Sequence, residues 1–384
     1  MTDMLSQQNF ERLAYVAFIA FIFSMPLFLD EFGLNRFSKY LVYGMLGIAI
    51  SLAWGYAGIL NLGQGLFFGI GAYAMAFSLK LAASSTAGGK TPIPDFMVVN
   101  AEPNAIPELS SITTGSWIWV PFQSQWFGVA MALAVPAILA GLIAYTLGRS
   151  RVSGVYVAII TLALVLLVRL IVIDQQQVTS GFNGLTDLAW FNLFGLELDP
   201  YAKSTYLIIA FALTIVLLIA RWLVSTRAGL VLQGIRDNEV RARYLGYSVV
   251  SYQIFFFVVS AMIAGLAGVL YVVAAEFASP TFLDIAFSIT MVVWAAVGGR
   301  ASLLGACIGA IGLNFIGATL SETESLMNAW QLIIGLIFIV VVLWLPRGLA
   351  GLASDLADRF VTRADDSKWN RFKSVKHTQS PANR

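Results

Sequence analysis

Long apolar runs separated by polar connections are the feature of this sequence that most restricts its fold. A helix needs about 20 mostly apolar residues to cross a bilayer, because it rises only about 1.5 Å per residue. Ten runs approach this length: 13–29, 39–56, 60–82, 126–147, 155–173, 204–224, 252–275, 283–298, 302–320 and 330–346. Charged residues make up only 11% of the chain, whereas about 25% is usual for a soluble domain. We therefore predict an all-α polytopic membrane protein with about ten transmembrane helices.

Two of these runs are weaker than the rest. Run 13–29 is short and contains Pro26, and no small-residue cleavage site follows it as one follows a signal peptide. We interpret it as a retained first helix. Run 283–298 is also short, so we expect a re-entrant or strongly tilted helix there.

Basic residues in the polar connections predict the orientation, because Lys and Arg concentrate in cytoplasmic loops. They gather in a turn near 149–151, in a charged segment at 225–251, and in a polar tail at 354–384. Ten spans place all three on the side of the N-terminus, so we expect both termini in the cytoplasm. Residues 1–353 then form a transmembrane domain. The 83–125 connection lies on the side opposite the termini, as either a flexible loop or a docking surface.

Several kinds of chemistry are excluded by composition. Cys307 is the only cysteine and His377 the only histidine, so the chain forms no internal disulfide and no zinc site. The GKT triplet at 89–91 lacks the upstream glycine of a phosphate-binding loop, since Ser84 stands there. A net charge of +2 does not indicate a nucleic-acid partner. We expect neither an enzyme nor a metal protein.

Small residues at four-residue spacing indicate where transmembrane helices pack closely. Gly65 and Gly69 form one such pair, and Gly305 and Gly309 form another, while Gly265 ends a related pair. Because lipid offers no hydrophobic drive for association, close backbone approach at these glycines is the expected source of helix packing.

The charged segment has the pattern of a short amphipathic helix. Asp237 lies four residues before Arg241, and Glu239 four before Arg243, an order that stabilises a helix by about 0.2–0.5 kcal/mol per pair. We expect Leu232, Ile235 and Val240 to form its apolar face. Gly229 and Gly246 are expected to interrupt the chain at its two ends. A basic loop held by anionic lipid is the alternative, but it needs neither the interleaved acids nor the glycines.

This segment, read as GLVLQGIRDNEVRARYLGYSVVSYQ, resembles the coupling loop of ATP-binding-cassette importer permeases of the branched-chain amino acid and urea type. GYAGILNLGQGLFFGIGAYAMA, SGVYVAIITLAL, VGGRASLLGACIGA and LPRGLAGL extend the resemblance over nearly the whole chain. In that family the loop docks as a short helix into a cytoplasmic ATPase. The resemblance implies that the docking positions here are Arg236, Asp237, Asn238, Glu239, Arg241, Ala242, Leu245 and Gly246.

The same resemblance implies the location, with residues 1–353 in the bacterial inner membrane and the 83–125 connection on its periplasmic side, and it implies the partners. They would be a second, similar permease subunit, two cytoplasmic ATPase subunits, a periplasmic substrate-binding protein and membrane lipid. ATP would be bound by the ATPases, so this chain itself would carry no cofactor.

Within that family the chain is most similar to the urea branch, and this resemblance implies urea or a short amide as the substrate. Gln64 stands where amino acid permeases of the family usually carry His, and IPDFMVVN at 93–100 is similar to an insert of the urea branch. Leu162, however, replaces a Gln of that branch, and Arg169 matches an Arg of amino acid permeases. A branched-chain amino acid importer therefore remains open, as does a passive urea channel, which would need no ATPase.

A path for urea would be lined by uncharged groups that both donate and accept hydrogen bonds. Asn61, Gln64, Thr161 and Asn314 are the candidates, since polar groups inside a membrane are often functional. For each of them the alternative, and the more common role of such a residue, is a hydrogen bond between helices. Arg169 is expected to reach the outer interface or to pair with Asp174 or Asp187.

Overall fold

The computed structural model describes residues 2–86, 119–150, 154–323, 326, 329–345 and 347–352. Most of the predicted periplasmic connection and the whole predicted tail lie outside these ranges. The long helices are α1 (Thr2–Ser24), α2 (Glu31–Ile50), α3 (Gln64–Thr86), α5 (Gln125–Arg149), α6 (Val155–Asp174), α8 (Lys203–Ser225), α9 (Arg227–Asp237), α11 (Val249–Ala275), α12 (Ile285–Gly298), α13 (Leu303–Glu322) and α14 (Trp330–Trp344). The all-α polytopic prediction is confirmed, and each of the ten apolar runs lies largely in a helix.

Short elements join these helices. The π-helix η2 (Ser51–Tyr56) continues α2 without a gap, and the 57–63 connection then leads to α3. The other short elements are η1 (Met25–Leu27), η3 (Pro121–Gln123), α7 (Gln176–Thr179), η4 (Gly181–Asn183), the hairpin strands β1 (Phe191–Leu193) and β2 (Leu196–Leu198), α10 (Glu239–Tyr244) and η5 (Pro280–Leu283).

Short polar side chains fix where several helices begin. Asp30 accepts a hydrogen bond from the backbone N–H of Gly33 at the start of α2, and Thr226 caps α9 in the same way. Asp284 caps α12 and Ser302 caps α13. Such caps satisfy backbone donors that have no partner within the helix, and each contributes about 1 kcal/mol.

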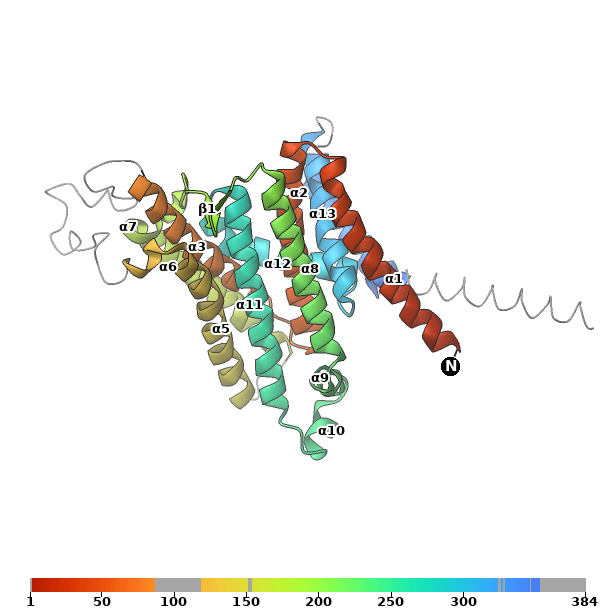
Figure 1. The fold of residues 1–384 in the computed structure, drawn as a ribbon. Coiled ribbons are helices and arrows are strands. Elements are labelled where there is room, and N and C mark those ends of the chain that lie inside the picture. Colours follow the sequence, from red (N-terminus) through yellow and green to blue (C-terminus); the bar gives the residue numbers. More distant parts are fainter. Residues whose placement is uncertain are drawn as a thin grey trace, which may run out of the picture.

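Helices α2, α3 and α11 form the centre of the bundle, where α11 packs on both α2 and α3 (Figure 1). Between 72% and 78% of the residues in their apolar stretches are buried, against 28% in α5 and 22% in α6. The exposed side chains of α5 and α6 are mostly Leu, Ile, Val and Tyr, as lipid-facing helices require. Among the described residues, seven helices are long and apolar enough to cross a membrane.

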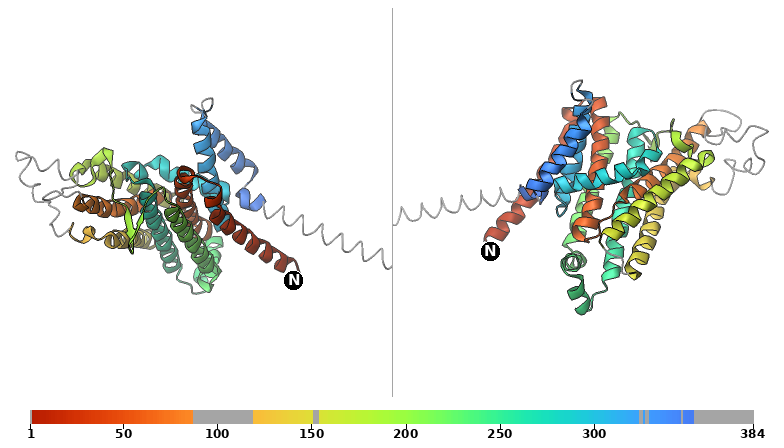
Figure 2. Two further views of the ribbon diagram at one scale, coloured as in Figure 1. Left: turned by 45° about the horizontal axis from the view of Figure 1, so that its top comes forward. Right: turned by 180° about the vertical axis from the view of Figure 1, so that it is seen from behind.

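Helix α12 is one of two shorter apolar helices, the other lying in α14. With 14 residues it rises about 21 Å, less than the roughly 30 Å of a hydrocarbon core. It runs obliquely across the back of the bundle (Figure 2). The short element expected in this run is therefore present, and it lies at an angle to the long helices.

The two ends of the bundle carry different structures. Helices α9 and α10 extend beyond one end, and the β1–β2 hairpin lies at the other (Figure 1). The hairpin was not predicted from the sequence. Its two-residue turn is formed by Phe194 and Gly195, both with positive φ, which matches the twist of a tight hairpin.

Candidate functional site

The charged segment folds into two helices rather than the single helix predicted. Asn238 has extended φ and ψ of −156° and 95°, and it both ends α9 and caps α10 by accepting from the N–H of Arg241 at 2.9 Å. The predicted Glu239–Arg243 ion pair is present on α10. The predicted Asp237–Arg241 pair is wrong, because the break at Asn238 removes the helical spacing that it needs.

Three further details of the segment differ from the prediction. Asp237 pairs instead with the neighbouring Arg236 at 3.0 Å. Gly229 is not a break: it lies inside α9, which begins after Thr226, whereas Gly246 does interrupt the chain with a φ of +87°. Val240 does not belong to the buried face, since 63% of it is exposed.

One side of the charged segment is buried against the protein, and the other side is exposed. Leu232 and Ile235 are buried, and Ile235 packs with Ala242 and Val249. On α10 and the turn after it, Tyr244 is 88% exposed and Leu245 is 71% exposed. An exposed aromatic and aliphatic pair at the tip of a charged segment is the composition of an interface centre.

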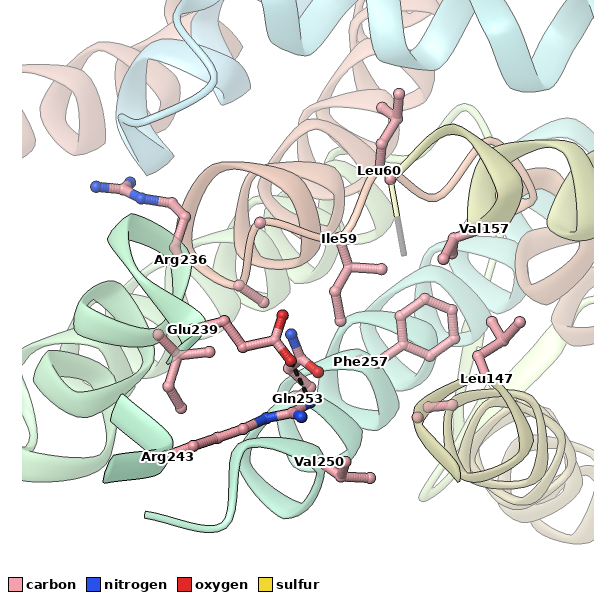
Figure 3. Close-up of a pocket in the computed structure, with 16 residues that line it drawn as sticks. Ile59, Leu60, Leu147, Val157, Arg236, Glu239, Arg243, Val250, Gln253 and Phe257 are labelled. Atoms are coloured by element: carbon pink, nitrogen blue, oxygen red, sulfur yellow. Dashed lines mark hydrogen bonds and ion pairs between the residues drawn. The ribbon is translucent and has the colours of Figure 1, made fainter. Parts of the chain in front are cut away.

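A cavity of about 210 Å³ lies between α10 and the membrane helices. Glu239, Arg243 and Gln253 point into it, and Ile59, Leu60, Leu147, Val157 and Phe257 form its apolar side (Figure 3). Figure 3 shows Arg236 turned away from this cavity. Helix α10 therefore lies over this cavity, whereas α9 packs against the rest of the protein through the buried Leu232 and Ile235.

The structure brings three of the four path candidates together, at the 57–63 connection. The Asn61 amide donates to Gln64 Oε1 at 2.7 Å, and the Gln64 amide donates to Ser260 O and Oγ at 3.1 and 3.2 Å. Thr161 Oγ1 accepts from the N–H of Leu62 at 3.2 Å. We call Asn61, Gln64, Thr161 and Ser260 the polar cluster. All four are nearly fully buried, and their described hydrogen bonds involve only neutral groups.

The fourth candidate, Asn314, lies apart from this cluster. It is on α13, and its amide donates to the carbonyl of Ala310 one turn earlier in the same helix, at 2.8 Å. Ser260, in contrast, was missed. A serine in the middle of the apolar run 252–275 is a sufficient signal, because polar groups in such runs are uncommon.

The glycines singled out for packing all lie where another element passes close by. A Cβ atom at Gly309 would come within 2.5 Å of the Cα of Gly298 on α12, and one at Gly305 within 2.6 Å of that residue's carbonyl oxygen. At Gly65, Gly69 and Gly265 an added Cβ would overlap Ser288, Leu283 and Ala132 respectively. Only glycine allows these approaches without a shift of the neighbour.

Arg169 pairs with Asp284 at 3.2 Å, not with Asp174 or Asp187. The pair joins α6 to the cap of α12, and the two side chains are 27% and 33% exposed. Asp284 also accepts from the N–H of Ala286, so it holds both the arginine and the start of the helix.

A bundle of apolar helices with a helical, partly exposed loop at one end has the architecture of the membrane subunit of a transporter. The chain matches the family described as branched-chain amino acid transport system permease component over residues 34–343, and it belongs to that family. It is a permease component of an ATP-binding-cassette importer, a multi-pass inner-membrane protein and not an enzyme. Permeases of this class work with an ATPase and a binding protein.

Its relatives are distant. It is 23% identical to the high-affinity branched-chain amino acid transport system permease protein LivM of Escherichia coli K12, over 88% of this chain and 75% of LivM. The Salmonella typhimurium LivM is 22% identical over the same shares. The ribose import permease protein RbsC of Escherichia coli K12 is 25% identical over 49% of this chain and 59% of RbsC. No solved structure matches the chain.

Proposed function

We propose that this chain is the membrane-spanning permease of an importer that carries urea or a short amide. The polar cluster beside the 57–63 connection supplies the main support, because it is buried and contains amides and hydroxyls but no charge. Urea has both amide donors and a carbonyl acceptor. It therefore offers both kinds of hydrogen-bonding group that Asn61, Gln64 and Ser260 use with one another.

The ATPases would act on the permease through the charged segment. With both termini in the cytoplasm, α9 and α10 face the cytoplasm, and the exposed Tyr244 and Leu245 dock on an ATPase. Asp237, Asn238, Glu239, Arg241, Ala242 and Gly246 would complete the docked element, whereas Arg236 of the same segment bonds to the membrane domain. A second, similar permease, two ATPase subunits that bind ATP, and a binding protein on the hairpin side would complete the importer. ATP binding would close the two ATPases on each other, and this closure would move the segment and shift the permease between an inward-facing and an outward-facing state.

A branched-chain amino acid importer is the second candidate. The Arg169–Asp284 pair favours it, because a partly exposed pair of opposite charges can exchange partners with the carboxylate and ammonium of a zwitterion. The LivM relatives have this substrate class in their names.

Competition uptake separates the two candidates. The complete importer is reconstituted in liposomes with its binding protein, and uptake of labelled urea is measured against excess leucine, and the reverse. We expect ATP-dependent urea uptake that leucine does not reduce. Uptake of leucine alone would replace the proposal by the second candidate, and urea uptake without ATP would indicate a passive channel.

A further inference from the structure

Arg236 is oriented toward the membrane domain rather than toward the exposed face of the charged segment. It lies in the last turn of α9, and its side chain is two-thirds buried. Two of its nitrogens, Nε and Nη2, donate to Asp237 Oδ1 at 3.0 Å each. The third, Nη1, donates to the carbonyl oxygen of Gly55 at 2.6 Å, across 181 residues of sequence. Asp237 thus fixes the orientation of the Arg236 guanidinium, and Nη1 of Arg236 bonds to the membrane domain.

Gly55 is in the π-helix η2, at the end of the central helix α2. Carbonyls at the end of a helix have no partner within it, so a cation there satisfies an open acceptor and the negative end of the helix dipole. π-Helical turns are uncommon and occur often at functional sites. Gly58, with a φ of +72°, packs against the Arg236 stem, since a Cβ there would lie 3.0 Å from Arg236 Cγ.

The same π-helix contacts the turn between α12 and α13. A Cβ atom at Gly55 would overlap the carbonyl oxygen of Arg300, and Ser51 Oγ donates to that oxygen at 2.9 Å. The Arg300 guanidinium lies over the Trp54 ring, 5.2 Å from its centroid. Therefore η2 cannot shift without moving this turn.

Beyond η2 the chain enters the 57–63 connection, which is bonded to three other helices. It reaches α6 through Thr161 and α11 through Gln64 and Ser260, and Ser260 Oγ donates in turn to the Ala49 carbonyl of α2 at 2.7 Å. A displacement of η2 therefore reaches the polar cluster through covalent and hydrogen bonds without a gap.

We propose that Arg236 is a positioning residue that transmits movement of α9 to η2, and through it to the polar cluster. The proposal rests on the proposed function, since it assumes an ATPase that moves the charged segment. It separates two tasks within that segment: the exposed tip around Tyr244 binds the ATPase, and Arg236 passes the movement inward. The cavity beneath α10 supports this division, because α10 bridges a hollow while Arg236 makes a direct bond.

The test compares Arg236→Met, which keeps the apolar stem but loses all donors, with Arg236→Lys, which can still reach the Gly55 carbonyl. Arg227→Met is the matched control, because it removes the same charge from the exposed start of the same helix. Each variant is purified as the complete importer. Co-purification of the ATPase, the ATP hydrolysis rate, and the amount of labelled solute imported per ATP are measured together.

For Arg236→Met we expect full co-purification of the ATPase and continued hydrolysis, with at least a tenfold loss of solute imported per ATP. Arg236→Lys should recover part of this ratio, and Arg227→Met should match the wild type. Hydrogen exchange adds a structural readout: the change that ATP causes in residues 51–63 should be lost in Arg236→Met and retained in α9.

Three results would overturn the proposal. They are an unchanged import ratio in Arg236→Met, an unchanged exchange response in residues 51–63, and loss of the ATPase from the complex, which would make Arg236 a docking residue. If Arg236→Met does not accumulate, Arg236→Gln carries the test, since its shorter side chain lacks the guanidinium that bonds to Gly55, and a wild-type import ratio for it would refute the proposal. Absence of ATP-dependent uptake by the wild type would refute the proposed function instead.

Discussion

Replacing Gly309 by alanine should separate α12 from α13. The new methyl carbon would lie 2.5 Å from the Cα of Gly298, 2.6 Å from its nitrogen and 2.7 Å from the Trp294 carbonyl oxygen. All three are backbone atoms, so no side chain can rotate away. Carbon atoms in contact lie about 3.5–4.0 Å apart, so the two helices must move apart by about 1 Å.

The cost follows from the contacts that this movement weakens. Each pair of heavy atoms contributes about 0.1–0.2 kcal/mol, and a gap of about 1 Å forfeits up to half of that. For roughly 30 pairs at the crossing, the loss is about 1–3 kcal/mol, within the usual range for overpacking. Gly312→Ala is the matched control on the same helix, because its Cβ would meet nothing within 4 Å. There alanine should stabilise α13 by about 0.5–1 kcal/mol.

Thermal unfolding of the two variants in one detergent gives the comparison. We expect the apparent Tm of Gly309→Ala to fall by roughly 2–12 °C and that of Gly312→Ala to rise slightly, since 1 kcal/mol shifts Tm by about 2–4 °C in a chain of a few hundred residues. Because such unfolding is often irreversible, both variants are scanned at one rate. Equal shifts of the same sign would refute the inference that the glycine is needed for close approach.

Three further predictions concern the charged segment, the polar cluster and the Arg169–Asp284 ion pair. Tyr244→Ala should weaken ATPase binding to permease in lipid nanodiscs by about 30-fold, or roughly 2 kcal/mol, because its ring is the most exposed on α10. Tyr145→Ala, on the exposed surface of α5, should leave that affinity unchanged, and equal losses would argue against a specific docking face. Gln64→Leu should destabilise the protein by about 1–3 kcal/mol in thermal unfolding, since it removes an amide that three described hydrogen bonds use; an unchanged Tm would mean that water or a neighbour replaces it. A double-mutant cycle on Arg169 and Asp284 should give a coupling below about 1 kcal/mol, because both side chains are about one-third exposed; a much larger coupling would show a desolvated pair.

The helices were predictable because a bilayer imposes a local requirement, namely the length and apolarity of each run. The division of the charged segment was not predicted, although its signal was present. Asn is among the favoured residues before a helix, and Asn238 separates α9 from α10 in this way. Because the acids and bases were assigned to a single helix, the Glu239–Arg243 pair was predicted correctly and the Asp237–Arg241 pair was not.

Contacts between distant segments could not be predicted from the sequence. Whether a polar residue joins a cluster or bonds within its own helix depends on which helices pass nearby, as Gln64 and Asn314 show. For the same reason, the partner of Arg169 proved to be Asp284 rather than an acid close in sequence. The substrate is less determined than the fold, because neutral amides and a charge pair are both present.

Uptake of labelled urea in proteoliposomes, with ATP and the ATPase each added or left out, tests the central claim most directly. An importer driven through α9 and α10 should accumulate urea against its gradient only when the ATPase and ATP are both present. Deleting the side chains of Tyr244 and Leu245 should abolish that accumulation. Equal uptake without ATP, or accumulation that survives loss of both side chains, would contradict the account.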